Sequence, residues 1–62
     1  MKRYVLFNEK KGFFVKLRDG EFGYEPYYSK DLNQAAIYDK ESAELQQEEE
    51  KIVEVKVDIR LA

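Results

Sequence analysis

The sequence predicts an α+β fold: a three- to five-stranded antiparallel sheet with one helix packed on one face, in the order β-β-(β)-β-α-β. Three observations predict it. Two runs rich in β-branched and aromatic residues, 3–8 and 13–17, are joined by a short turn. Asp39, which can cap a helix, precedes a polar stretch. The chain then closes with a run in which apolar and charged residues alternate.

The first two runs, RYVLFN (3–8) and FFVKL (13–17), predict a β-hairpin. The intervening EKKG supplies the turn, because Gly12 can adopt a positive φ. Because successive side chains of a strand point to opposite sides, the second strand has two faces. One face carries Phe13, Val15 and Leu17, and the other carries Phe14, Lys16 and Arg18.

RDGEFG (18–23) is a second reversal, because Asp-Gly strongly favours a turn. GYEPYYSK follows, and Pro26 restricts it to an edge strand or an extended loop, because proline has no amide hydrogen for a central ladder. SKDLNQ (29–34) predicts a helical turn, and AAIY (35–38) a very short strand.

Asp39 is the expected N-cap of a helix from about Lys40 to Glu50, with Glu41 favourably placed against the helix dipole. KIVEVKVDIRL (51–61) predicts a half-buried antiparallel strand. Its expected core face is Val53, Val55, Val57, Ile59 and Leu61, and its expected solvent face is Glu54, Lys56, Asp58 and Arg60.

The 62 residues are enough for one small domain, 1–62, of marginal stability. The chain has no cysteine and no histidine, so disulfides and the usual zinc ligands are missing. No apolar run approaches a membrane span and no signal-peptide core follows the start, so a cytoplasmic protein is expected, in the host cytoplasm if it is phage-encoded.

Catalytic groups are scarce. The only serines are Ser29 and Ser42, no phosphate-binding or calcium-binding loop is present, and pairs of acids such as Asp19 with Glu21 are typical of solvated surface. We therefore expect no enzyme activity, no cofactor and no metal.

The first candidate surface is the acidic segment DKESAELQQEEEK (39–51). It breaks local rules for helices, because it places glutamates near the negative end of the helix dipole. An acidic array can occupy a basic surface of a partner protein; the alternative is a helix kept soluble by its charges. The candidate partner-binding residues are Glu41, Glu44, Glu48 and Glu49.

The second surface is the N-terminal hairpin, since residues 1–18 carry six basic side chains and one acidic one, whereas residues 19–62 carry five and twelve. Basic side chains interleaved with aromatic rings can grip a single nucleic-acid strand. The alternative is strand alternation, with the rings in the core and the lysines protecting an edge. The candidate nucleic-acid-binding residues are Arg3, Lys10, Lys11, Phe14, Lys16 and Arg18.

The third surface comprises Tyr24, Tyr27 and Tyr28, which flank Pro26. Tyrosine is enriched at protein interfaces because a large apolar ring ends in a hydrogen-bonding group. These rings are therefore further partner-binding candidates, and the alternative is that they build the core of a small domain.

The order of YVLFNEKKGFFVK, DLNQAAIYDKESAE and a terminal alternating strand resembles small α+β proteins encoded by bacteriophages and prophages, mostly of unknown function. The shared step from strand into helix is formed by Ala35 or Ala36, Ile37, Tyr38, Asp39 and Ala43. The resemblance implies an accessory protein that binds and inhibits a host or defence-system protein. It implies no catalytic residue.

The leading hypothesis is thus a non-enzymatic, phage-type protein that binds a protein with a basic surface, through the acidic helix. The alternative is a nucleic-acid-binding module that uses the basic hairpin. A homodimer formed through a sheet edge is also consistent with an open sheet in so short a chain.

Overall fold

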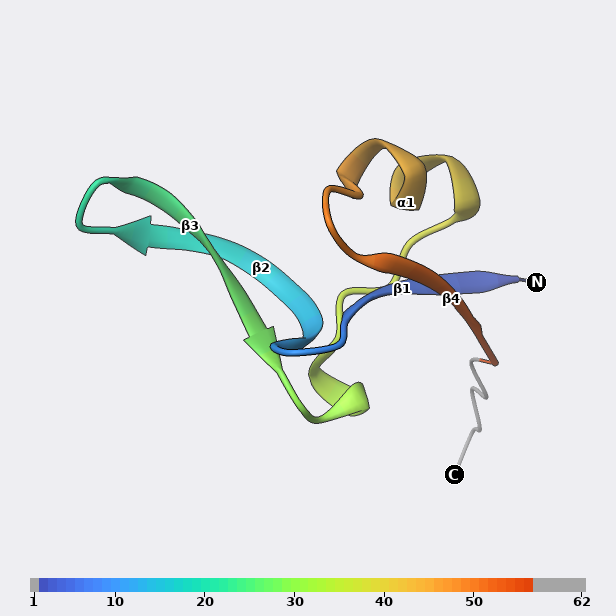
Figure 1. Ribbon diagram of the computed structural model, residues 1–62. Coiled ribbons are helices and arrows are strands. Elements are labelled where there is room, and N and C mark those ends of the chain that lie inside the picture. The colour runs from blue at the N-terminus through green and yellow to red at the C-terminus, as the bar shows by residue number, and fades with distance from the viewer. Residues whose placement is uncertain (1, 57–62) are drawn as a thin grey trace, which may run out of the picture.

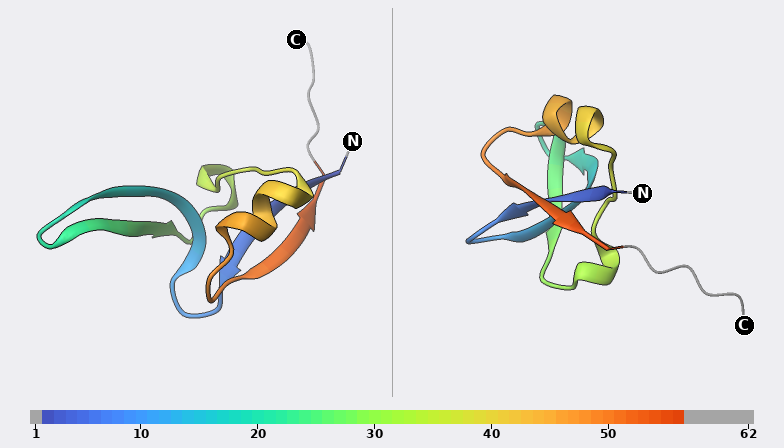
Figure 2. Two further views of the ribbon diagram at one scale, coloured as in Figure 1. Left: turned by 90° about the horizontal axis from the view of Figure 1, so that it is seen from above. Right: turned by 90° about the vertical axis from the view of Figure 1, so that its right-hand side faces the viewer.

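The computed structural model, which describes residues 2–56, has a four-stranded antiparallel sheet and one α-helix, and this confirms the predicted fold class. The strands are β1 (Arg3–Asn8), β2 (Gly12–Gly20), β3 (Gly23–Ser29) and β4 (Lys51–Val55), arranged in the order β3-β2-β1-β4. A 3-10 helix, η1 (Leu32–Gln34), and the helix α1 (Lys40–Gln46) connect β3 to β4. The two helices lie on opposite sides of the β1–β4 ladder (Figures 1 and 2).

The predicted β1–β2 turn forms around Asn8 and Gly12. The Asn8 Oδ1 atom accepts hydrogen bonds from the backbone N–H groups of Lys10 (2.9 Å) and Lys11 (3.0 Å). Gly12 has φ +102°, and a Cβ atom there would lie 2.4 Å from the carbonyl oxygen of Ser29. This position therefore requires glycine for both its conformation and its packing.

The core lies where β1 crosses beneath α1. Leu6, Phe14 and Ala43 are buried together, and the partly buried side chains against them are Tyr4, Tyr28, Ala36, Tyr38 and Ile52. Leu6 is fully buried because Ala43, the small residue of α1, allows the helix to approach closely.

β4 presents a different face to this core from the one predicted. Leu6 pairs with Ile52, and Ile52 packs against the core, whereas Val53 is 39% exposed. The prediction that Val53 belongs to the core under the helix is wrong, because the register places Ile52 on the side of α1. Val57, Ile59 and Leu61 lie outside the described residues.

The segment 35–38 completes the sheet beside β1. Tyr38 exchanges two backbone hydrogen bonds of 2.8 Å with Tyr4, and the N–H of Ala36 donates to the carbonyl of Phe14 (3.0 Å). The very short strand predicted there is a single bridge. This bridge lies on the same edge of β1 as β2, because β2 pairs with β1 only at Phe7–Phe13 and Asn8–Gly12.

Helix α1 begins as predicted and ends earlier. The Asp39 side chain caps it by accepting from the backbone N–H of Ser42 at 2.8 Å. The prediction that the helix continues to Glu50 is wrong, because the helix ends at Gln46 and Gln47 is extended. The side chain of Gln47 donates to the carbonyl of Glu50 (2.7 Å), which closes a turn. Glu48 and Glu49 therefore lie in the turn that follows α1 and not in its last helical turn.

β2 and β3 form a long hairpin that projects from the rest of the molecule (Figures 1 and 2). We call its distal part, residues 16–27, the hairpin arm. Its strands pair from Lys16–Tyr27 to Gly20–Gly23, and the pairing shifts between Phe14 and Lys16. This β-bulge at Val15 overturns the predicted faces of β2, because it brings Leu17 to the same side as Phe14.

Candidate functional site

A groove runs between the hairpin arm and the turn that follows α1. It has a volume of about 340 Å³. One wall belongs to β2 and β3 and the other to residues 46–50. The lining residues are Phe14, Leu17, Tyr24, Pro26, Tyr28, Gln46, Glu48 and Glu50.

The wall on the hairpin arm is apolar and open to solvent. Leu17 is 58% exposed and Tyr24 is 78% exposed, and Pro26, which pairs with Leu17, is exposed as well. At the base, the rings of Phe14 and Tyr28 meet edge to face with their centroids 5.9 Å apart. Rigid rings and aliphatic groups that remain solvated in the free protein are typical of protein interfaces.

The opposite wall is acidic. The Tyr28 hydroxyl donates a hydrogen bond of 3.0 Å to Glu50 Oε1, and the backbone N–H of Glu49 donates to Glu50 Oε2 at 2.7 Å. Glu50 is only 6% exposed, whereas Glu48 is exposed at the rim. Burial of the phenol, and then its bond to Glu50, raise the pKa of Tyr28 to about 12. The phenol therefore stays neutral and keeps its proton in this bond at physiological pH.

The other face of the hairpin arm is polar and largely neutralised. The guanidinium of Arg18 lies 3.5 Å from a carboxylate oxygen of Glu25 and 4.9 Å from the centroid of the Tyr27 ring. The two faces of the arm thus differ in chemistry, and the apolar face is the one that lines the groove.

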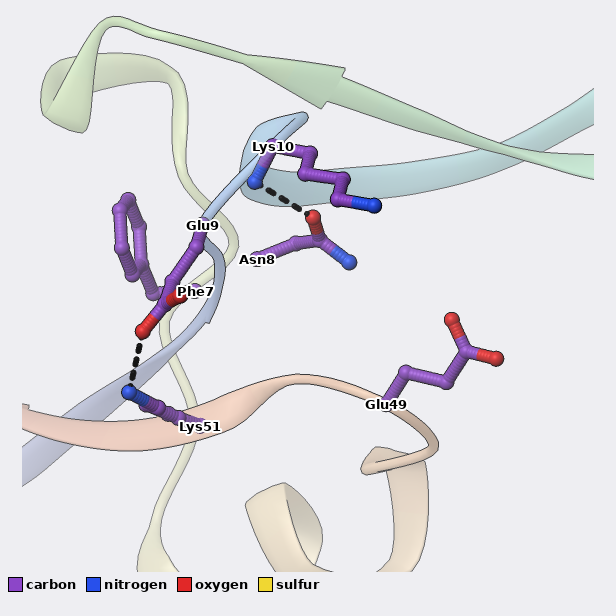
Figure 3. Close-up of a pocket in the computed structure, with 6 residues that line it drawn as sticks. All are labelled: Phe7, Asn8, Glu9, Lys10, Glu49 and Lys51. Carbon is purple, nitrogen blue, oxygen red and sulfur yellow. Dashed lines mark hydrogen bonds and ion pairs between the residues drawn. The ribbon is translucent and has the colours of Figure 1, made fainter.

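A second hollow, of about 440 Å³, lies at the β1–β2 turn and is lined by Phe7, Asn8, Glu9, Lys10, Glu49 and Lys51 (Figure 3). Lys51 forms an ion pair with Glu9, and the pairing lowers the pKa of the Glu9 carboxyl. The hollow is shallow and its charges are mixed. It therefore offers less apolar contact and no single charge to a partner.

The four predicted acidic residues lie in three different places. Glu41 and Glu44 are exposed on α1, Glu48 lines the groove, and Glu49 lines the second hollow. Tyr24 and Tyr28 meet in the groove, whereas Tyr27 stacks with Arg18 on the other face of the arm.

Several residues that shape the site are not among those predicted from the sequence. They are Leu17, Pro26, Gln46 and Glu50. The exposure of Leu17 depends on the bulge at Val15, and the burial of Glu50 depends on the early end of the helix. Neither the bulge nor the early end of the helix can be recognised in the local sequence pattern.

The predicted basic set is not gathered on one surface. Phe14 is 8% exposed within the core, so its ring does not offer a stacking platform. Lys10 and Lys11 lie at the β1–β2 turn, with the Lys11 ammonium 5.4 Å from the centroid of the Tyr28 ring. Lys16 and Arg18 lie on the hairpin arm, and Arg3 begins β1.

Two further findings bear on the site. Within residues 2–56, no three acidic side chains come together in a way that could hold a metal ion. Over the same residues, no helix has the length and apolar character needed to cross a membrane.

No family model matches the chain, and no match was found among curated proteins or solved structures. The resemblance to phage and prophage proteins therefore stays a prediction.

Proposed function

We propose that this chain is a non-enzymatic protein-binding protein whose groove receives an extended segment of a partner protein. One observation carries the proposal. The exposed apolar wall formed by Leu17, Tyr24 and Pro26 lines the same groove as the acidic side chain of Glu48.

The occupant that fits this groove has a lysine or arginine next to apolar side chains. The aliphatic stem of such a residue can lie along Tyr24 and Leu17 while its charged end reaches Glu48. The net charge of the chain, −2, also favours association with a basic surface. The narrower version of the proposal is a phage-type accessory protein that inhibits a host or defence-system protein by covering its basic surface. It is supported by the resemblance and by the acidic groove.

The alternative, nucleic-acid binding by the basic hairpin, receives less support from the geometry. Phe14 is in the core, and Arg18 is engaged by Glu25 and Tyr27. Retention on a heparin column that falls with added salt would favour this alternative.

A defined peptide tests the groove. A short extended peptide of alternating leucine and lysine is titrated into the isotopically labelled protein and followed by NMR. We expect the largest shift changes at Leu17, Tyr24 and Tyr28. A peptide with glutamate in place of lysine should bind several-fold more weakly, because it meets acidic side chains.

Two neighbouring glutamates provide a matched pair of variants. Glu48→Gln removes a charge from the groove, whereas Glu49→Gln removes one from the second hollow. The first should weaken peptide binding several-fold and the second should leave it nearly unchanged. Equal effects of the two variants, or shift changes confined to the second hollow, would contradict the proposal. A pull-down from a bacterial lysate with the parent protein and Glu48→Gln then identifies the natural partner.

A further inference from the structure

The tip of the hairpin arm exposes an aromatic ring. Gly20 pairs with Gly23, so the chain reverses through Glu21 and Phe22. Phe22 is 98% exposed. Gly23 follows at φ +115°, and apart from its two chain neighbours no residue has a heavy atom within 4 Å of the position that its Cβ would take. Phe22 therefore lies at the open end of the arm, away from the core.

The turn itself does not require an aromatic residue at this position. Among the described residues, only glycines have a positive φ, and here Gly23 adopts it. Phe22 itself does not have a positive φ, so the backbone of the turn places no special demand on the side chain at position 22. A ring that contributes neither to the turn nor to the core adds apolar surface, and Tyr24 and Leu17 continue the exposed apolar side chains along the arm.

The charges around the ring are acidic. Asp19 and Glu21 are both exposed, and within residues 2–56 neither takes part in an ion pair. The one basic side chain close to the turn, Arg18, is paired with Glu25. The tip therefore combines one apolar ring with two uncompensated carboxylates.

We propose that Phe22 is an anchor that inserts into an apolar pocket ringed by lysine or arginine side chains on a partner protein. The inference rests on the proposed protein-binding function but concerns a surface other than the groove. A single exposed aromatic in the middle of a contact can dominate an interface once its pocket excludes water. The carboxylates of Asp19 and Glu21 select the basic rim by charge complementarity.

The same charges disfavour two other occupants. The groove of a second copy is lined by Glu48 and Glu50, so the acidic tip would meet like charge there. An anionic membrane surface would repel Asp19 and Glu21 in the same way.

Cyclodextrins test the chemistry directly, because each offers an apolar cavity of a size that accepts an aromatic ring, with a rim of chosen charge. Amino-substituted, neutral and sulfated β-cyclodextrins are titrated at low salt and followed by the NMR signals of Phe22. We expect the cationic form to bind several-fold more tightly than the neutral form, and the sulfated form to bind most weakly. Phe22→Ser should abolish the shift changes at the turn.

A pair of double variants separates local charge from net charge. Asp19→Asn with Glu21→Gln should remove the preference for the cationic cyclodextrin. Glu41→Gln with Glu44→Gln removes the same total charge from α1 and should retain it. Equal binding of all three cyclodextrins by the parent protein, or the same loss in both double variants, would overturn the proposal.

Photo-crosslinking tests the anchor in cells. Benzoylphenylalanine is placed at position 22 and, as a control, at position 45, where Leu45 is 78% exposed on α1. We expect a protein crosslink from position 22 only, at an apolar site of the partner that is flanked by basic residues. No crosslink from position 22, equal crosslinking from both positions, or sedimentation of the parent protein with anionic vesicles would refute the anchor. If the groove peptide fails to bind while the Phe22 crosslink forms, the groove alone is refuted.

Discussion

The phenol of Tyr28 and the carboxylate of Glu50, 22 residues apart in sequence, are joined by a hydrogen bond of 3.0 Å at the base of the groove. Tyr28 belongs to β3, and Glu50 immediately precedes β4. The bond therefore links the projecting hairpin to the turn that follows α1. It holds the two walls of the groove together, and it provides a partner for a carboxylate that is only 6% exposed.

Tyr28→Phe should destabilise the protein. The substitution keeps the ring but removes the donor, so a buried carboxylate oxygen loses a partner, at a cost of about 1–3 kcal/mol. Urea unfolding followed by circular dichroism measures the change. Glu50→Gln is the control, because its amide oxygen can still accept from Tyr28 and no buried charge remains; it should cost less. If Tyr28→Phe unfolds at the same urea concentration as the parent protein, the bond does not stabilise the fold.

The same bond makes stability depend on pH in the alkaline range. The pKa of Tyr28 is raised from 10.0 to about 12 in the folded protein, because the phenol is partly buried and bonded to Glu50. The folded state thus retains a proton that the unfolded state loses. The resulting stability is fully present below pH 10 and is lost as the pH rises through about 12.

We therefore expect the parent protein to lose more stability than Tyr28→Phe between pH 9.5 and pH 11.5, a window on the order of the cited shift. Urea unfolding at the two pH values measures this difference, and the lysines affect both proteins alike. In parallel, absorbance at 295 nm should show one late-titrating tyrosine fewer in the variant. Identical pH dependence of the two proteins would show that Tyr28 titrates normally.

Leu6→Ala should strongly destabilise the protein, because Leu6 is fully buried beneath α1. Removing such a side chain costs about 2–5 kcal/mol, which is a large share of the roughly 5–15 kcal/mol of a typical domain. Leu45→Ala is the matched control, since Leu45 is 78% exposed and should change stability by less than about 0.5 kcal/mol. If the two variants lost similar amounts of unfolding free energy, Leu6 would not be a core residue.

Much of the fold follows from local sequence. Strand β1, the turn at Gly12, the edge strand containing Pro26 and the cap at Asp39 all appear where propensity and turn chemistry place them. The face that β4 turns to the core could not be predicted in the same way. Alternation shows that two faces exist, but the choice between Ile52 and Val53 depends on which side of the sheet α1 covers.

The candidate site was predictable only in part. The sequence predicts Tyr24, Tyr28 and Glu48 as binding residues, and all three line the groove. The prediction that Leu17 shares a face with Phe13 and Val15 is wrong, because a one-residue bulge reverses the alternation and leaves no mark on residue types. In the sequence Glu50 is only one member of a charge run, because its burial depends on a hydrogen bond from Tyr28.

Gly12→Ala and Gly23→Ala should differ, although both glycines have a positive φ. The backbone strain is common to the two variants and costs roughly 1–3 kcal/mol. At Gly12 the added Cβ would also lie 2.4 Å from the backbone carbonyl of Ser29, whereas at Gly23 it would meet no atom within 4 Å other than those of its chain neighbours. Thermal unfolding should therefore show the lower melting temperature for Gly12→Ala. The reverse order would contradict the close approach of the β1–β2 turn to β3.

Replacing Glu44, Glu48 and Glu49 with glutamine should separate binding from folding. All three side chains are exposed, and only Glu44 lies in α1, because the helix ends at Gln46. Glutamine has a helix propensity similar to that of glutamate, and its neutrality relieves repulsion among neighbouring acids. The free energy of unfolding should stay level or rise by a few tenths of a kcal/mol. Affinity for the leucine–lysine peptide should fall several-fold and lose much of its salt dependence.

The two readouts of this variant lead to different conclusions. A clear loss of stability would show that the glutamates support the fold through pairs with basic side chains of the sheet. Unchanged stability together with unchanged, salt-dependent peptide binding would show that the acidic wall of the groove does not contribute. The apolar wall would then carry recognition, and Tyr24→Ser, which alters an exposed ring without touching the core, should weaken the same binding.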